Sequence, residues 1–266
     1  MEDIGPDEGT VYLAVEEAEK GRVAWLTLSN PHKLNALSPG VVAALTAQAG
    51  ELAQDEELRV VVLTGAGARA FAAGADLGVL AGLDEDTGRA FITALHEAID
   101  AVRRLPCPVI GMLRGYCFGG AMELAAACDM RIADTTLMAG MPEVRVGIPS
   151  VIEACLLPRL IGWGKASELL LTGENIAAQE ALRVGFVQRL CAPEELESET
   201  QRLIDAILAA GPGAVRAQKR IMRGWEEMPE PGAVAASIDE FAAIYRTGEP
   251  AAFMRSFVER KMGARQ

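Results

Sequence analysis

A glycine pair followed by a glutamate, Gly119-Gly120 and then Glu123, is the part of this sequence best suited to chemistry. The pair lies between an apolar run and an alanine-rich stretch that is expected to be helical. The first turn of a helix presents backbone N–H groups that lack helical partners, and the helix dipole favours negative charge there. Such amides can hold a developing oxyanion beside a carboxylate that moves a proton. This combination indicates chemistry at a carbonyl group.

The same residues also fit a simple helix start, in which Glu123 only interacts with the dipole. Two further segments favour the catalytic interpretation. Residues 70–77 are predicted to form a loop of small residues, which would let a ligand approach the backbone amides closely. Glu143 adds a second carboxylate after a predicted strand. Two acids in such positions can divide the base and acid roles around one water or substrate.

Other chemistries have little support in the sequence. Its only histidines, His32 and His96, lie far apart, and it contains no HExxH, no GxSxG and no cysteine–histidine cluster with metal-ligand spacing. The net charge of −12 argues against nucleic acid or an anionic membrane as the main partner. Proton chemistry is therefore expected to depend on carboxylates.

The five cysteines are an odd number without a CxxC pair, which is typical of reduced thiols in a cytoplasmic protein. The first residues lack the features of a signal peptide, and no stretch approaches the roughly 20 apolar residues that span a bilayer. We therefore expect a cytoplasmic protein that does not enter the membrane.

The elements that would position the candidate residues alternate between strand and helix. Predicted strands are residues 11–15 and 23–28, which form a hairpin, and the apolar runs 60–64, 109–113 and 130–133. Predicted helices cover residues 39–54, with Ser38 as the N-cap, and residues 86–104. This alternation predicts an α/β core over residues 1–193. Strand signals then fade, which predicts a helical C-terminal region over residues 194–266.

Together, these segments resemble the enoyl-CoA hydratase/isomerase, or crotonase, superfamily, and within it the enoyl-CoA hydratases. The matching segments are Asn30-Pro31 with Asn35-Ala36-Leu37, the loop Phe71-Ala72-Ala73-Gly74-Ala75-Asp76, the turn from Gly115 to Glu123, and Leu170-Leu171-Thr172-Gly173 with the stretch up to Val187. The resemblance implies a spiral core of repeated ββα units with two nearly perpendicular sheets. It also implies a helical C-terminal trimerisation region, a homotrimer or homohexamer, and a coenzyme A thioester substrate without a metal or redox cofactor.

The resemblance also implies roles for individual residues. The N–H groups of Ala75 and Gly120 would bind the thioester oxygen. Glu123 and Glu143, at the family's spacing of twenty residues, would hold a water between them. One would take its proton during attack on the β-carbon, and the other would take part in protonating the α-carbon. The implied coenzyme contacts are Lys33, Ala73, Asp76, Leu77 and, from a neighbouring subunit, Phe257 and Arg260.

The segment after Gly147 departs from the family pattern. Hydratases continue with a glycine-rich helix start, whereas this chain has Val151, Ile152 and a third acid, Glu153. We expect Glu153 to be an exposed helix residue. The departure leaves the acyl group undefined and keeps alternative functions open: a Δ3-Δ2-enoyl-CoA isomerase, a CoA thioester hydrolase, or a non-catalytic binding protein with this fold.

Overall fold

The predicted apolar runs become neighbouring strands of a six-stranded sheet with the order β1-β2-β3-β5-β7-β10. The computed structural model describes residues 9–263, except for the side chains of Pro31, Phe257 and residues 260–263. The strands are β1 (Thr10–Ala18), β2 (Gly21–Ser29), β3 (Leu58–Gly65), β4 (Ala70–Ala72), β5 (Val109–Leu113), β6 (Tyr116–Phe118), β7 (Met130–Asp134), β8 (Met138–Gly140), β9 (Asn175–Ala177) and β10 (Arg189–Cys191).

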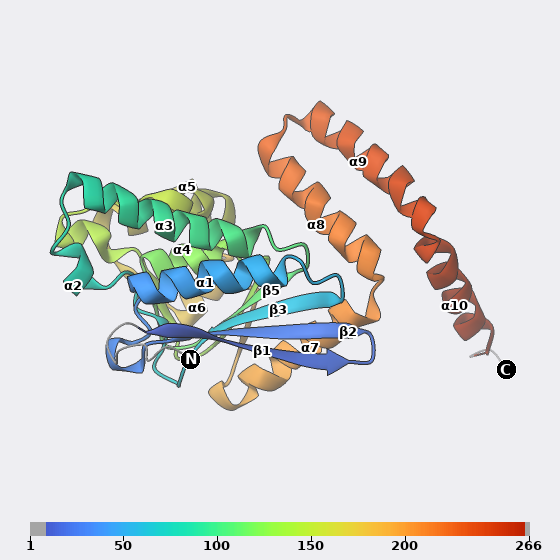
Figure 1. Ribbon diagram of the computed structural model, residues 1–266, viewed down its shortest axis with the longest axis horizontal. Coiled ribbons are helices and arrows are strands. Elements are labelled where there is room, and N and C mark those ends of the chain that lie inside the picture. The colour runs from blue at the N-terminus through green and yellow to red at the C-terminus, as the bar shows by residue number, and fades with distance from the viewer. Residues whose placement is uncertain (1–8, 264–266) are drawn as a thin grey trace.

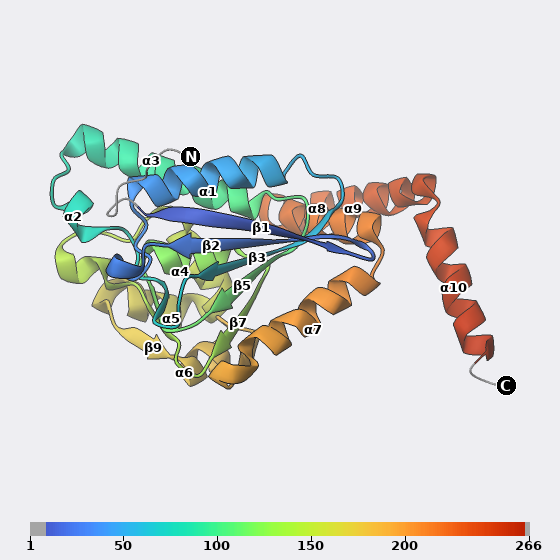
Figure 2. The ribbon, with the colours of Figure 1, turned by 60° about the horizontal axis from the view of Figure 1, so that its bottom comes forward.

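The helices of the core cover the sheet on both faces (Figures 1 and 2). They are α1 (Pro39–Leu52), α2 (Leu77–Leu80), α3 (Glu85–Arg103), α4 (Gly120–Ala127), α5 (Leu157–Thr172), α6 (Ala178–Arg183) and α7 (Leu196–Ala209). The short 3-10 helices are η1 (Pro31–Lys33), η2 (Pro142–Val146), η3 (Ile152–Leu156), η4 (Pro193–Glu195) and η5 (Tyr245–Thr247). The predicted hairpin is confirmed, and Ser38 caps α1 as expected. The two predicted helices end one or two residues earlier than the sequence indicated.

Successive ββα units build a spiral with two sheets. The first strands of three units, β3, β5 and β7, are neighbours in the six-stranded sheet, and their second strands, β4, β6 and β8, are neighbours in a four-stranded sheet. Each of these pairings is parallel. The chain therefore adds one strand to each sheet with every turn of the spiral, as the family resemblance implies.

Where the chain passes from the six-stranded sheet to the four-stranded sheet, two backbone segments lie so close together that only glycine fits between them. Gly115 precedes β6 with φ +56°, a conformation that residues with a Cβ seldom adopt. A Cβ at Gly115 would also overlap the carbonyl of Arg69. The glycine thus lets the chain leave β5 and enter the second sheet directly.

Apolar side chains fill both sides of the six-stranded sheet. Along β3, Val61 and Leu63 pack into the main core, while Val60 and Val62 pack with Leu196 and other residues on the opposite face. Helix α7 covers that second face (Figure 2). The sequence assigned α7 to the C-terminal region because strand signals fade after residue 193, yet α7 packs on the core sheet.

The C-terminal helical segment begins with α8 (Pro212–Glu227). It continues through α9 (Glu230–Ile244) and α10 (Glu249–Gly263), which extend away from the sheets (Figure 1). Within residues 9–263, no helix is long and apolar enough to cross a lipid bilayer.

A buried ion-pair network attaches α8 to the core. Lys219 is 7% exposed, and its Nζ donates to Asp129 Oδ2 at 2.7 Å and to the carbonyl of Cys107 at 2.8 Å. Arg223 Nη2 donates to the other Asp129 oxygen at 3.2 Å. Asp129 also accepts a hydrogen bond at 2.7 Å from the backbone N–H of Val109, the first residue of β5. The carboxylate therefore joins the helix to the sheet.

Lys219→Met is expected to lower the free energy of unfolding by about 3 kcal/mol, because it leaves a largely buried carboxylate short of a cation. Urea denaturation would measure this loss. Arg220→Met is the matched control, since Arg220 forms an exposed pair with Glu240 and such pairs contribute about 1 kcal/mol or less. Equal losses in the two variants would contradict the importance of the buried network.

Candidate active site

The candidate residues gather around one cavity of about 330 Å³. Its walls come from the loop after β4, from α2 and α3, from the start of α4, and from the segment around η2. The lining residues are Ala73, Gly74, Ala75, Leu77, Leu80, Phe91, Ile92, Leu95, Phe118, Gly119, Gly120, Glu123, Pro142, Glu143, Arg145, Val146, Ile148, Pro149, Ser150 and Val151. The cavity is therefore mostly apolar, and its polar side chains are two carboxyl groups, one hydroxyl group and the guanidinium group of Arg145.

The loop after β4 lies directly against the turn before α4. Gly74 has φ +91°, and a Cβ there would lie 2.7 Å from the carbonyl oxygen of Phe118, so the approach requires glycine. The N–H of Leu37 donates to the carbonyl of Gly74 at 2.8 Å and holds the loop from the other side. This packing places Ala75 and Gly120 in the same cavity.

Gly120 is the first residue of α4, where backbone N–H groups have no acceptor within the helix. The preceding N–H, that of Gly119, donates to the carbonyl of Gly140 on β8 at 2.9 Å and so fixes the turn on the second sheet. The helix start is thereby held in place at the cavity wall. Such a site can stabilise negative charge on an oxygen atom without a charged side chain.

Glu123 lies one turn into α4 and is 3% exposed. Its Oε1 accepts a hydrogen bond from the backbone N–H of Ala154 at 3.1 Å. Burial, and then the nearby charges of Glu143 and Glu153, raise the pKa of Glu123 to about 9. The carboxyl group is therefore largely protonated at neutral pH.

Glu143 is less deeply buried and has a different partner. Its side chain reaches the cavity from η2, and its Oε2 accepts a hydrogen bond from the Ser150 hydroxyl at 2.8 Å. The two glutamates thus face one cavity in unlike surroundings, which is the arrangement that separates an acid from a base. The sequence did not indicate Ser150, since a lone serine in a loop carries no signal of its partner.

The expectation that Glu153 is an exposed helix residue is wrong. Its side chain is buried on η3, and its Oε1 lies 2.7 Å from Nδ1 of His96 on α3. The sequence could not show this because the two residues are 57 positions apart and the turn before Glu153 has an unusual backbone. Burial raises the pKa of the Glu153 carboxyl, and the hydrogen bond from His96 opposes this shift.

The predicted coenzyme contacts fall into three groups. Ala73 and Leu77 line the cavity. Lys33 and Asp76 form an ion pair at 2.9 Å instead, and the other Asp76 oxygen caps α2 by accepting from the N–H of Gly78 at 2.8 Å. The side chains of Phe257 and Arg260 lie outside the described residues.

Asn35 joins two loops near the cavity through hydrogen bonds of its side chain. This buried side chain donates to the carbonyls of Ala66 and Ala70, each at 3.0 Å, and accepts from the N–H of Asn30 at 3.1 Å. It thereby links the loop before α1 to the loop before β4. The same loop carries Leu37, which holds Gly74, so Asn35 supports the cavity wall indirectly.

Comparisons with known proteins identify relatives of this chain. The sequence profile described as enoyl-CoA hydratase/isomerase matches residues 18–264. A short-chain enoyl-CoA hydratase of Clostridium acetobutylicum is 33% identical over 91% of this chain and 94% of its own length. An (E)-benzylidenesuccinyl-CoA hydratase of Thauera aromatica is 34% identical over 78% of this chain and 81% of its own.

A solved structure shows the same fold at similar identity. The crystal structure of an enoyl-CoA hydratase from Bacillus anthracis superimposes with a TM-score of 0.88 at 31% identity, covering 93% of this chain and 96% of that one. The fold is therefore the crotonase fold, as the ββα repeats indicate. On the profile match and these relatives, the chain belongs to the enoyl-CoA hydratase/isomerase family.

Proposed function

We propose that the protein is an enoyl-CoA hydratase that adds water reversibly across the α,β double bond of a 2-enoyl-CoA thioester. Its relatives make it an enzyme of the hydro-lyase class. The observation that carries the specific proposal is the pair of carboxyl groups, Glu123 and Glu143, facing one cavity beside Ala75 and Gly120.

The unlike surroundings of the two glutamates support a division of roles. Glu143, with its hydroxyl partner, takes a proton from the bound water while the water oxygen bonds to the β-carbon. The electrons of the double bond move toward the thioester oxygen, where the N–H groups of Ala75 and Gly120 stabilise the enolate. Glu123, which holds a proton at neutral pH, gives it to the α-carbon. The proton that Glu143 took from water must then pass to Glu123, directly or through solvent, to restore both groups for the next turnover. This sequence of steps needs no metal or redox cofactor.

The cavity supports an acyl group that is mainly apolar. Its lining includes Leu80 of α2 and Phe91, Ile92 and Leu95 of α3, together with Val151. In this proposal Ala73 and Leu77 contact the coenzyme side of the substrate. Lys33 and Asp76, which form an ion pair at the same loop, also contact the coenzyme. Phe257 and Arg260 are proposed coenzyme contacts from a neighbouring subunit.

The proposed reaction can be tested by loss of absorbance at the enoyl thioester band, with crotonyl-CoA and longer 2-enoyl-CoAs. Hydration of any of these substrates supports the proposal, and the preferred length defines the acyl range. Conversion of 3-enoyl-CoA to 2-enoyl-CoA without hydration would instead identify an isomerase, and release of free coenzyme A a thioester hydrolase. Absence of all three activities would favour a binding protein.

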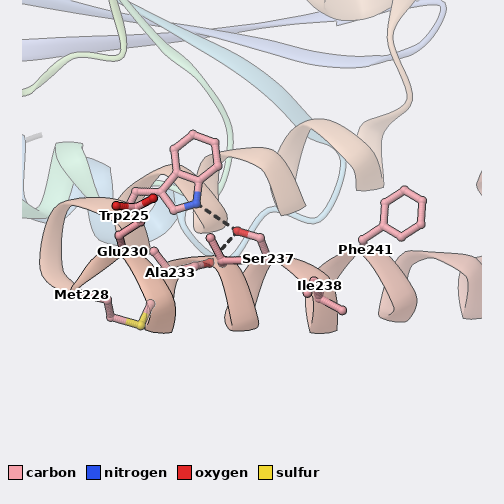
Figure 3. Close-up of a pocket in the computed structure, with 8 residues that line it drawn as sticks. Trp225, Met228, Glu230, Ala233, Ser237, Ile238 and Phe241 are labelled. Carbon is pink, nitrogen blue, oxygen red and sulfur yellow. Dashed lines mark hydrogen bonds between the residues drawn. The ribbon is translucent and has the colours of Figure 1, made fainter.

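We propose that the helical segment after residue 211 joins copies of this chain into a trimer or hexamer. Helices α8 and α9 enclose an apolar groove of about 640 Å³. Figure 3 shows Trp225 of α8 hydrogen-bonded through its indole to Ser237 of α9, while Ile238 and Phe241 stand outside this contact. Trp225, Val234, Ile238 and Phe241 all line this groove and are each more than half exposed, and such a cluster of exposed apolar side chains is typical of an interaction site.

An acidic substitution in this groove is expected to disrupt assembly. Phe241→Glu places a charge where the proposed interface excludes water, so light scattering coupled to gel filtration should report a smaller species than the wild type. Leu182→Glu on α6 is the matched control, since it replaces an exposed apolar residue of the core. An unchanged mass in Phe241→Glu, or a monomeric wild type, would contradict the proposed assembly.

We also propose that the protein acts in the cytoplasm. All five cysteines are unpaired, and three of them, Cys107, Cys117 and Cys128, are buried. Unpaired thiols of this kind are typical of a reducing compartment. Cell fractionation tests this assignment, and recovery from a secreted fraction would contradict it.

A further inference from the structure

An unusual turn, which begins at Val151 in the cavity wall, packs against the Glu123 side chain. It includes η3 and packs against α3, α4 and α5. Ile152, its first helical residue, has φ +40°, which is strained for a β-branched side chain. Backbone strain of this kind persists only where surrounding contacts hold it. The contacts that hold this turn are therefore of interest.

The hydrogen bond between His96 and Glu153 is such a contact. Glu153 is 4% exposed and its Oε1 lies 2.7 Å from His96 Nδ1, whereas the His96 side chain is 49% exposed. The second Glu153 oxygen is buried and has no hydrogen-bond partner among the residues that the structure describes. The hydrogen bond to His96 therefore connects this carboxyl group, and with it the turn, to α3.

The residue after Glu153 connects this contact to Glu123. The N–H of Ala154 donates to Glu123 Oε1 at 3.1 Å, and the backbone at Val151 adds a second favourable interaction with the same carboxyl group. One short turn therefore presents to Glu123 a hydrogen-bond donor, which favours its anion. It also presents the carboxyl group of Glu153, whose charge favours the protonated form.

We propose that His96 and Glu153 are positioning residues for Glu123: their hydrogen bond holds the η3 turn in its strained form, and the turn sets both the orientation and the protonation of Glu123. This inference rests on the proposed function, in which Glu123 delivers the proton to the α-carbon. Neither residue lines the cavity, so neither is expected to touch the substrate.

The groups that face this pair are few. On α3, Asp100 adds a repulsive charge toward Glu153. Glu123 on α4 interacts electrostatically with Glu153 and also with Glu143 on η2. On α5, Arg159 is directed to the carbonyl of Glu226 and lies in a separate pocket. The carboxyl groups of Asp100, Glu123 and Glu143 are therefore the charged groups around the pair, while Arg159 is engaged elsewhere.

Three variants and a matched control test the inference. His96→Leu removes the donor, His96→Asn restores an N–H group near the position of Nδ1, and Glu153→Gln keeps an acceptor for His96 but removes the charge. The control is Glu97→Gln, which removes an exposed charge next to His96 on the same helix. Steady-state kinetics give kcat, KM and the pH profile, and hydrogen–deuterium exchange reports on residues 151–156.

In His96→Leu, kcat for crotonyl-CoA should fall about tenfold with little change in KM, and the turn should exchange faster. His96→Asn should recover most of the wild-type kcat and most of the wild-type protection of the turn from exchange. In Glu153→Gln, loss of the neighbouring charge lowers the pKa of Glu123, so the alkaline limb of kcat should move by about one unit to lower pH. The Glu97→Gln variant should match the wild type throughout.

The outcomes also separate this inference from the proposed function. If the wild type hydrates no enoyl-CoA, the proposed function is wrong, while exchange in residues 151–156 still decides whether His96 holds the turn. Exchange in His96→Leu equal to that in the wild type would overturn the inference. So would a lower melting temperature in His96→Leu and Glu153→Gln with unchanged kcat and pH profile, because it would leave the pair a purely structural role.

Discussion

Glu143→Gln is expected to lower kcat for hydration about 10²–10⁴-fold, the range found when a general acid or base is removed. Glutamine keeps the shape of the side chain and an oxygen that can accept from Ser150, which donates to Glu143 at 2.8 Å. It cannot accept a proton from the bound water. The loss should therefore appear in kcat, with a smaller change in KM, when crotonyl-CoA hydration is followed by absorbance.

Glu123→Gln should cause a loss of the same order, and its effect on stability makes a useful control. In the native state the pKa of Glu123 is raised to about 9 from its ordinary value of 4.5. Between these values the unfolded chain releases a proton that the native state retains, so this group lowers stability as pH rises through the window. Glutamine removes that dependence.

The variant should consequently unfold at the same or a higher temperature than the wild type at pH 8, although it is inactive. A differential scanning calorimetry series from pH 5 to pH 9 would show whether its stability declines less steeply. Hydration at near wild-type rates in either glutamine variant would refute the mechanism with two carboxyl groups. Inactivity accompanied by a collapsed melting temperature would refute the assigned protonation of Glu123.

Gly119→Ala is expected to reduce kcat about 10²–10³-fold, similar to the loss of one oxyanion donor. Gly119 has φ +55°, and a Cβ there would overlap the Glu143 carboxylate. The new methyl group must displace either that carboxylate or the start of α4, which carries Gly120. Both changes misplace groups that act in the transition state, so the proposed mechanism predicts a loss mainly in kcat.

Gly67→Ala is the control for this experiment. Gly67 also has a positive φ, +74°, but a Cβ there has no heavy atom within 4 Å. Alanine at this position therefore carries a cost of positive φ without the overlap. If both variants lose the same activity, general strain rather than contact with Glu143 would explain the result.

The sequence was informative where structure depends on local pattern. Residues 109–113 form β5 as predicted, because a continuous apolar run with turns on both sides suits a strand buried on two faces. The glycines before Glu123 likewise predicted the start of a helix, where backbone N–H groups have no helical acceptor, and α4 begins at Gly120. The motif spacing then placed Glu123 and Glu143 in one site, and both do line one cavity.

The sequence was less informative where structure depends on distant partners. Strands β4, β6, β8 and β9 have three residues each, too few for a period to emerge, and they form only through pairing with one another. The burial of Glu153 depends on His96, which comes from another helix. Helix α7 was placed outside the core because its packing on β3 and β7 has no local signal.

The spiral of ββα units has a consequence for how this scaffold can change. The amides at Ala75 and Gly120 belong to two successive turns, whose strands lock them into both sheets. The stretch from Gly147 to Leu156, in contrast, pairs with no strand and forms much of the remaining wall. Residues of this stretch that do not hold Glu123 or Glu143 can be exchanged without disturbing the amides. Substitutions in one short loop can therefore change the substrate range of such a protein, while the two amides that stabilise the reacting oxygen keep their positions.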